Sequence, residues 1–437
     1  LSDSWCRGMT SDMSDGTNEV YYALFQNDQG QKLYQYAYNP ELPLKPEKEL
    51  TVYTLYDQAT INQAATLFGK KHPDTMVSVH VACADTDDKE AETQRNRLMT
   101  SLAAGDGEDV IVLSGLDDNA LAKKGVLMDL SDIVTPMEEN GELLQAIVDG
   151  EKAADGKQQI LPVRFALPLL LSKEKRASEM TDLAALAKAA EQTDGSLLGT
   201  FTGEDLVETF APYFMPDIIK DKQLDTEKLR TVLQELQTIA AHCDMVEKYK
   251  KGERASNEWD LPSAMQAVLC QISGFNDAMF DLAIINLVKG DYTSFENAYI
   301  PTVEIGVNAN TKQADLAKEF AAFVMSREVQ DGDFYDGFPV NKESLHMQVS
   351  LDRSDYAAYT TIEGADGQEI GLDIEPIKAA DADKLEALCD SLSKKTVKDA
   401  KVLEELKKSV PDYLLGRQSL DDTISKIQDG VKIYLAE

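Results

Sequence analysis

Strand and helix patterns alternate along the chain once the first 49 residues are passed. Residues 50–56 are rich in strand-forming side chains, 59–71 carry apolar residues at helical spacing, and 76–83 alternate between apolar and polar positions. A helical pattern follows at 90–104, and a short apolar run at 110–113 predicts a third strand. Since parallel strands are joined by right-handed helical crossovers, this order predicts an α/β domain with a parallel sheet.

The middle of the chain is mainly helical. Four stretches have a helical pattern: 181–190, 203–214, 226–243 and 261–273. A strand at 302–307 and a helix at 314–326 then resume the α/β pattern. The remaining part of the chain ends in an amphipathic helix at 421–435. The later strand and helix are therefore expected to complete the domain that the first half begins.

The first 48 residues follow a different pattern. Residues 19–26 and 31–38 are rich in Tyr, Val, Phe and Leu, and the turn-forming segment 27–30 separates them, so we expect a β-hairpin. Three prolines in 40–46 predict an extended linker. Because one hairpin cannot form a core by itself, it either docks on the main body or ends an upstream β-domain.

Composition limits the classes of protein that fit. Hydrophobic residues make up 43% of the 437 residues, and the length suits two or three domains of roughly 150 residues each. The net charge of −34 disfavours binding to nucleic acid and to anionic membrane surfaces. The longest apolar stretch, 160–171, contains Arg164 and two prolines and is shorter than the roughly 20 residues that cross a bilayer. A chain that starts at Leu1 without a leader pattern is expected to be a processed protein or a fragment.

Two segments imitate known sites. Gly105 and Gly107 form a G-x-G pattern, but a predicted helix precedes it and a strand follows, the reverse of a dinucleotide site, so we expect a helix stop and a turn. The acidic run 85–90 resembles a calcium loop only at its first ligand positions, because Lys89 and Glu90 occupy the next required places. We therefore expect a solvated loop there.

Histidine and cysteine form no recognisable site. The four histidines lack zinc-protease spacing, and the five cysteines lie at long, irregular intervals with no C-x-x-C. Whether Cys243 and Cys270 pair stays open. We expect no metal, no cofactor, no catalytic residues and no enzyme activity. An extracellular hydrolase that uses two of the 77 carboxylates stays open as an alternative.

Several segments together carry a family pattern, and they occur in the family's order: 50–57, 68–74, 77–79, 102–113, 121–130, 305–310, 317–320 and 337–342. They resemble the extracellular solute-binding proteins of ABC transporters, the family that includes maltose-binding protein. The resemblance covers about residues 50–437 and leaves out 1–48. Two features depart from the family pattern: Glu108 stands where proline is usual, and Trp259 is the sole tryptophan in the region.

The resemblance implies a two-lobe α/β fold of the class II periplasmic-binding-protein type with hinge crossings, here preceded by the short β-hairpin segment. Lobe one would comprise residues 50–165 plus 300–336, and lobe two would comprise 166–299 plus 337–437. Residues 1–48 would be the hairpin and linker. The resumption of the α/β pattern at residue 302 fits such crossings.

Candidate ligand contacts follow from strand ends and crossings, because ligands in open α/β sheets lie beyond the carboxyl ends of strands. After the first and third strands these are Tyr56, Asp57, Ser114, Gly115, Leu116 and Asp117. The crossings and lobe two add Arg164, Phe165, Tyr213, Phe214, Trp259, Phe275, Asn276, Tyr335 and Phe338. The Asp57 carboxylate could accept two sugar hydroxyls, and Tyr56 would offer an aromatic face.

The resemblance implies a receptor that captures a small solute between two lobes and delivers it to the permease subunits of an ABC importer. We expect an oligosaccharide, with a cationic solute as the rival because the chain is acidic. We expect a monomer outside the cell, held by a lipid anchor on a segment not in this chain. The alternative is a surface sensor or interaction module in which the solute-binding region is fused to an upstream β-rich, propeller-like domain.

Overall fold

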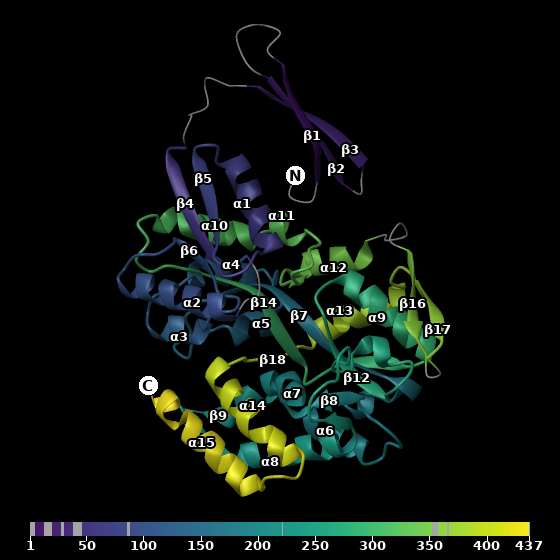
Figure 1. Ribbon diagram of the computed structural model, residues 1–437. Coiled ribbons are helices and arrows are strands. Elements are labelled where there is room, and N and C mark those ends of the chain that lie inside the picture. Colours follow the sequence, from purple (N-terminus) through teal and green to yellow (C-terminus); the bar gives the residue numbers. More distant parts are fainter. Residues whose placement is uncertain are drawn as a thin grey trace. The chain divides into compact units, whose positions relative to one another are not determined.

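The computed structural model describes residues 5–12, 20–27, 30–37, 46–84, 88–220, 222–351, 357–364 and 367–436 (Figure 1). The chain divides by its internal contacts into two compact units. Unit 1 comprises residues 1–133 and 305–332, and unit 2 comprises residues 134–304 and 333–437. The chain thus passes from one unit to the other after residues 133, 304 and 332. The lobe boundaries expected at residues 165, 299 and 336 stay a prediction.

An antiparallel sheet of three strands forms near the N-terminus (Figure 1). Its strands are β1 (Trp5–Asp12), β2 (Val20–Asn27) and β3 (Gly30–Ala37), and β2 lies between the other two. The predicted hairpin is confirmed as β2 and β3. The strand β1 was not predicted, because its sequence WCRGMTSD lacks a regular alternation. Residues 28 and 29 of the turn and 40–45 of the predicted linker lie outside the described residues.

Unit 1 contains the predicted α/β pattern. Its elements are β4 (Lys48–Thr54), α1 (Ala59–Lys71), β5 (Thr75–Val81), α2 (Asp88–Ala103) and β6 (Val110–Val112). Strand β4 pairs in parallel with both β5 and β6, as the crossovers predicted. The end of β14 (Ala298–Val307) adds an antiparallel strand beside β6. The carboxyl ends of β4 and β6 therefore lie at one edge of this sheet.

Aromatic packing joins helices α1 and α10 of unit 1. Phe68 of α1 is fully buried and meets Phe320 and Phe323 of α10 (Ala314–Val324) at ring-centroid distances of 5.3 and 5.6 Å.

The two segments that imitate a dinucleotide site and a calcium loop both belong to unit 1. Gly105 and Gly107 have φ of +79° and +117° and form the turn between α2 and β6, as expected. Residues 85–87 of the acidic run lie outside the described residues.

Unit 2 is built around β7 (Leu161–Ser172), in which all 12 residues are buried. Its antiparallel partners include β12 (Ala267–Ile272), β13 (Asp291–Ser294) and β15 (Phe338–Pro339). The long apolar run is thus a central strand, buried on both faces. A helical core adjoins it and contains α6 (Leu183–Ala190), α7 (Gly203–Ile218), α8 (Thr226–Ala241), α14 (Ala400–Leu414) and α15 (Leu420–Ala436).

One predicted helix is wrong. The segment 261–273 contains strand β12, and helix α9 (Phe275–Val288) begins only after Gly274. Residues 267–272 pair with β7 from Ala267 opposite Ser172 to Ile272 opposite Leu167. Pairing with a buried strand therefore overrides the helical spacing of the apolar residues in this segment.

The remaining elements are α3 (Asp118–Lys123), α4 (Ser131–Glu139), α5 (Gln145–Gly150), β8 (Thr200–Thr202), β9 (Ile219–Lys220), β10 (Gln223–Leu224), β11 (Asp244–Val246), α11 (Arg327–Gln330), α12 (Lys342–Ser350), β16 (Ala358–Glu363), β17 (Glu369–Ile374), α13 (Ala379–Asp390) and β18 (Lys394–Lys395), with single 3₁₀ turns at 173–175, 177–179 and 258–260. Among the described residues, no helix combines the length and apolar composition that a membrane span needs.

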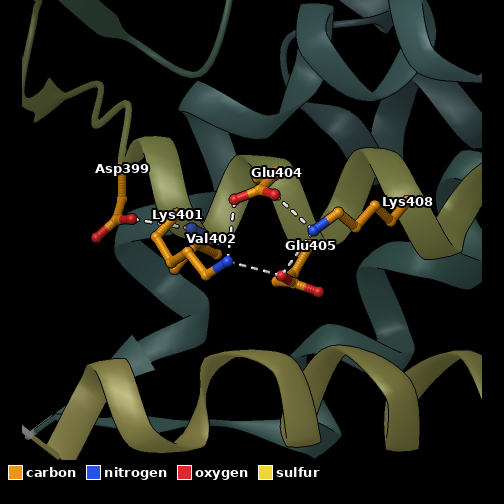
Figure 2. A network of polar contacts seen from close by, with 6 residues as sticks. All are labelled: Asp399, Lys401, Val402, Glu404, Glu405 and Lys408. Atoms are coloured by element: carbon orange, nitrogen blue, oxygen red, sulfur yellow. Dashed lines mark hydrogen bonds and ion pairs between the residues drawn. The ribbon is translucent and has the colours of Figure 1, made fainter. Parts of the chain in front are cut away.

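Exposed ion pairs line one side of α14 (Figure 2). Asp399 caps the helix, since its Oδ1 accepts a hydrogen bond from the backbone N of Val402 at 2.9 Å. Lys401 Nζ lies 2.9 Å from a carboxylate oxygen of Glu404 and 2.9 Å from one of Glu405, one turn or less away. Such solvated pairs add little stability individually.

A buried ionic cluster ties β14, β18 and α5 together in unit 2. Lys395 of β18 contacts the carboxylates of Glu151 and Glu304, the second at 2.9 Å. Tyr299 Oη lies 3.2 Å from both the carbonyl oxygen of Ile147 and the Glu151 carboxylate. Burial raises the pKa of Glu151 and the neighbouring Glu304 raises it further, whereas Lys395 opposes both effects.

Candidate functional site

Tyr56 and Gly115 meet where β4 and β6 end in unit 1. A Cβ atom on Gly115 would lie 3.4 Å from Tyr56 Cε2 and 3.1 Å from Leu55 Cδ2, so the half-buried Tyr56 ring lies close beside the Gly115 backbone. Gly115 has a φ of +79°, which a residue with a side chain rarely adopts. Glycine thus allows both the turn and the close approach of the ring. These two predicted contacts are brought together.

Asp57 and two residues that the sequence did not single out complete this edge. Asp57 is exposed, and its Oδ1 accepts a hydrogen bond from Asn62 Nδ2 on α1 at 2.8 Å. Arg95 of α2 donates from Nε to the carbonyl oxygen of Gly115 at 2.7 Å. Asn62 is five residues from Asp57 and could have been found as its neighbour in the first turn of α1. Arg95 has no comparable signal, because the fold alone brings it to Gly115.

The loop after β6 contains the other predicted contacts of unit 1. Leu116 donates from its backbone N to the carbonyl oxygen of Leu113 at 2.8 Å and so forms a tight turn. Asp117 is the N-cap of α3, and its Oδ1 accepts from the backbone N of Ala120 at 2.9 Å. Ser114 lies inside this turn, between Leu113 and Leu116, and is half-buried. Asp117 therefore has a structural role, and any role in binding would be additional.

Three predicted contacts of unit 2 form a buried aromatic cluster. Phe338 lies opposite Phe165 in the β15–β7 pairing, with ring centroids 5.8 Å apart. Phe275 meets the ring of Phe338 edge to face at 5.0 Å. All three side chains are almost fully buried. Packing of this kind stabilises the fold, and these rings do not offer open faces.

The segment before β15 is held against β7. Arg164 is fully buried, and its guanidinium carbon lies 5.3 Å from the centroid of Phe334, a cation–π distance. Gly337 has a φ of +137°, and a Cβ there would lie 2.8 Å from Arg164 Cβ. The two predicted contacts Arg164 and Phe165 are therefore both buried side chains of β7. Tyr335, on the same segment, is strongly exposed.

Asn276 lies in the first turn of α9 with a buried side-chain oxygen. Among the described residues, Asn276 Oδ1 has no hydrogen-bond partner. A buried acceptor without a donor costs stability, so this oxygen is suited to a donor that the described residues do not supply.

Tyr213 and Phe214 lie inside the helical core of unit 2. The Tyr213 ring meets Phe295 edge to face at 5.1 Å, and burial raises the pKa of Tyr213. Both rings are enclosed by apolar side chains, which leaves no face for a ligand. Trp259 is different, because it is partly exposed and its ring lies 4.3 Å from that of Phe280.

A buried acid, Asp281, follows Phe280 on helix α9, and Phe280 packs on the Trp259 ring. Asp281 is buried, and Cys270 Sγ, a free thiol, lies 3.4 Å from Asp281 Oδ2. Burial and then the charge of Glu258 raise the pKa of Asp281 to about 8.

Within each unit taken by itself, the described residues contain no group of three or more Asp, Glu, His or Cys side chains that could bind one metal ion together.

Solved structures share this fold. The open conformation of a sugar transporter from Rhizobium etli matches with a TM-score of 0.58 at 14% identity and covers 88% of this chain and 99% of that one. The sugar-binding protein MalE from Xanthomonas citri matches with a TM-score of 0.60 at 14% identity, over 89% and 97% of the two chains. A substrate-binding protein from Listeria monocytogenes in complex with cycloalternan matches with a TM-score of 0.54 at 14% identity, over 89% and 99%.

These likenesses confirm the predicted α/β fold of the periplasmic-binding-protein type. No curated protein matches the chain in sequence. Residues 54–331, more than half of the chain, match the family described as bacterial extracellular solute-binding protein. This range contains the β4–β6 edge with Tyr56 and Gly115. The chain therefore belongs to the bacterial extracellular solute-binding proteins.

Proposed function

We propose that the protein captures an oligosaccharide and delivers it to the permease subunits of an ABC importer. The observation that carries the proposal is the edge formed by Tyr56, Asp57 and Gly115 at the ends of β4 and β6. A half-buried tyrosine ring gives a flat apolar surface for the C–H face of a sugar, and an exposed carboxylate accepts hydroxyl hydrogen bonds. The turn at Gly115 brings its backbone against the Tyr56 ring, and Asp57 follows Tyr56 in the chain.

Three residues of unit 2 stay proposed contacts: Trp259, Asn276 and Tyr335. Trp259 and Tyr335 expose aromatic surface, and Asn276 has a buried acceptor that lacks a partner among the described residues. The buried rings of Phe165, Phe275 and Phe338 and the core residues Tyr213 and Phe214 are not part of the proposed contact set.

The chemistry of the relatives supports a sugar rather than another solute. The Xanthomonas citri protein is named as sugar-binding, and the Listeria monocytogenes protein was solved with cycloalternan. A cationic solute is the rival, because the net charge is −34. Salt separates the two, since binding of a cation weakens steeply with ionic strength and binding of a neutral sugar does not.

Substitution of Tyr56 tests the proposed platform. Tyr56→Ala is expected to weaken oligosaccharide binding about tenfold, equivalent to about 1.4 kcal/mol, because it removes the stacking surface. Tyr56→Phe keeps the ring and should lose less. Isothermal titration calorimetry measures both, with Tyr36→Ala on the N-terminal sheet as the matched control. Equal affinity of wild type and Tyr56→Ala for the oligosaccharide would remove Tyr56 from the site.

The N-terminal sheet favours a second candidate, a surface sensor fused to an upstream β-rich domain. Both faces of this sheet carry exposed apolar residues: Met9, 70% exposed, shares a face with Tyr21, whereas Leu33, 67% exposed, points to the other face. A sheet that is apolar on both faces is typical of an inner layer. The gene sequence upstream of Leu1 tests this, since a signal peptide and lipid-anchor cysteine directly before Leu1 would exclude a large extra domain.

A further inference from the structure

The backbone of Tyr56 is held where strand β4 ends. Thr54 Oγ1 donates to the carbonyl oxygen of Tyr56 at 2.5 Å, and Thr54 itself is only 1% exposed. The backbone N of Cys83 donates to the carbonyl oxygen of Leu55 at 2.9 Å, so the sheet continues up to that residue. These contacts fix the main chain but not the side chain, whose rotamer depends on what the ring packs against.

The Tyr56 ring packs against Gly115, which lies in a tight turn. A Cβ on Gly115 would lie 3.4 Å from Tyr56 Cε2 and 3.8 Å from Tyr56 Cδ2, so the ring lies along the backbone of this glycine. The hydrogen bond from Leu116 N to the carbonyl oxygen of Leu113 closes a β-turn over residues 113–116. Gly115 is the third residue of the turn, and its φ of +79° fits a type II turn.

Glycine by itself does not hold this turn in one arrangement. Because glycine adopts positive and negative φ about equally well, the peptide groups on either side of Gly115 can reorient at little steric cost. Such a change would move the surface against which the Tyr56 ring packs. A contact from another part of the chain can select one arrangement of the turn.

Arg95 of helix α2 makes such a contact. Its Nε donates to the carbonyl oxygen of Gly115 at 2.7 Å, which fixes the peptide group between Gly115 and Leu116. A hydrogen bond from a charged donor is roughly twice as strong as one between neutral groups. Arg95 is half-buried, and Leu98, about one helical turn later, is buried and anchors this part of α2.

We propose that Arg95 is a positioning residue for the Tyr56 platform: it holds the turn 113–116 against the ring and acts on sugar binding only through it. The inference rests on the proposed role of Tyr56 in oligosaccharide binding. Its contacts run from Arg95 Nε to the Gly115 carbonyl oxygen, and from the Gly115 backbone to the Tyr56 ring. Loss of the first contact should loosen the turn and leave the ring less well oriented for the sugar.

A double-mutant cycle tests whether Arg95 acts through Tyr56. Arg95→Met removes the donor and should weaken oligosaccharide binding about threefold, whereas in a Tyr56→Ala background it should cost nothing more. Arg95→Gln places a neutral N–H at the position of Nε and should recover most of the affinity. Arg97→Met, at an exposed position two residues along α2, is the matched control and should bind like wild type. Calorimetric titration measures all of these affinities. An equal loss from Arg95→Met with and without the Tyr56 ring would overturn the proposal.

Hydrogen exchange tests the hold on the turn without any sugar. Mass spectrometry of the whole chain should show faster amide exchange at residues 114–117 in Arg95→Met, and near wild-type exchange there in Arg95→Gln and Arg97→Met. Unchanged exchange at 114–117 in Arg95→Met would also overturn the proposal. If the wild type binds no oligosaccharide but exchange at the turn rises in Arg95→Met, the proposed function fails and the hold of Arg95 on the turn stands.

Discussion

Replacement of Lys395 by methionine should lower the free energy of unfolding by about 3–5 kcal/mol. The Lys395 side chain is only 15% exposed and lies between the carboxylates of Glu151 and Glu304, whose side chains are 1% and 8% exposed. Methionine keeps the apolar stem of the lysine and removes the charge that both buried carboxylates contact. Urea unfolding of the whole chain measures the loss.

Lys401→Met is the matched control, because Lys401 also contacts two glutamates, of which Glu404 is 50% exposed and Glu405 14% (Figure 2). Its side chain is 37% exposed, so water replaces the lost pairs and the cost should stay below about 1 kcal/mol. Adding Glu151→Gln and Glu304→Gln to Lys395→Met should restore much of the stability. Similar losses for Lys395→Met and Lys401→Met would show that burial of the cluster has no energetic effect.

Asp281→Asn should raise the free energy of unfolding by about 4 kcal/mol at pH 7. Burial raises the pKa of Asp281 to about 8, whereas an unfolded aspartate has a pKa of 3.8. Between these values the folded state holds a proton that the unfolded state has released. Stability from this group is therefore present below pH 4 and is lost as the pH rises toward 8. Asparagine has a similar shape and carries no charge to bury.

The pH dependence of this variant distinguishes the pKa effect from a change in packing. Urea midpoints of wild type and Asp281→Asn should agree near pH 4 and diverge progressively up to pH 8. Asp429→Asn on the exposed side of α15 serves as the control and should follow wild type at every pH. A difference between wild type and Asp281→Asn that is the same at pH 4 and pH 8 would contradict the raised pKa.

The sequence predicted unit 1 well because local periodicity and tertiary structure agree there. The apolar spacing of α1 points Ile61, Ala64 and Phe68 toward the sheet, and all three are buried. Beta-rich runs such as 50–56 have no competing helical pattern. Parallel pairing then followed from the alternation of strand and helix alone.

Unit 2 was predicted less well because its strands depend on partners far away in the chain. Strand β12 has a helical spacing of apolar residues, and only its pairing with β7 about 100 residues earlier makes it extended. Contacts of this range leave no local signal for a periodicity argument.

The candidate site was predicted in part, and the reason is geometric. Tyr56 and Gly115 could be expected to meet, because both follow parallel strands of one sheet. Tyr213 and Phe214 could not be told from ligand platforms, since aromatic residues on a helix look alike in sequence whether they line a site or a core. Arg95 was missed because its contact with Gly115 depends on how α2 packs.

Calorimetric titration of the whole chain tests the central claim, that the protein is an oligosaccharide receptor. The panel comprises oligosaccharides, peptides and polyamines, measured at low and high salt. We predict micromolar or tighter binding of at least one oligosaccharide, about −8 kcal/mol or better, with little change in affinity between the two salt concentrations. A folded protein that binds none of the oligosaccharides, or that binds only polyamines with a steep loss of affinity in salt, would contradict the claim.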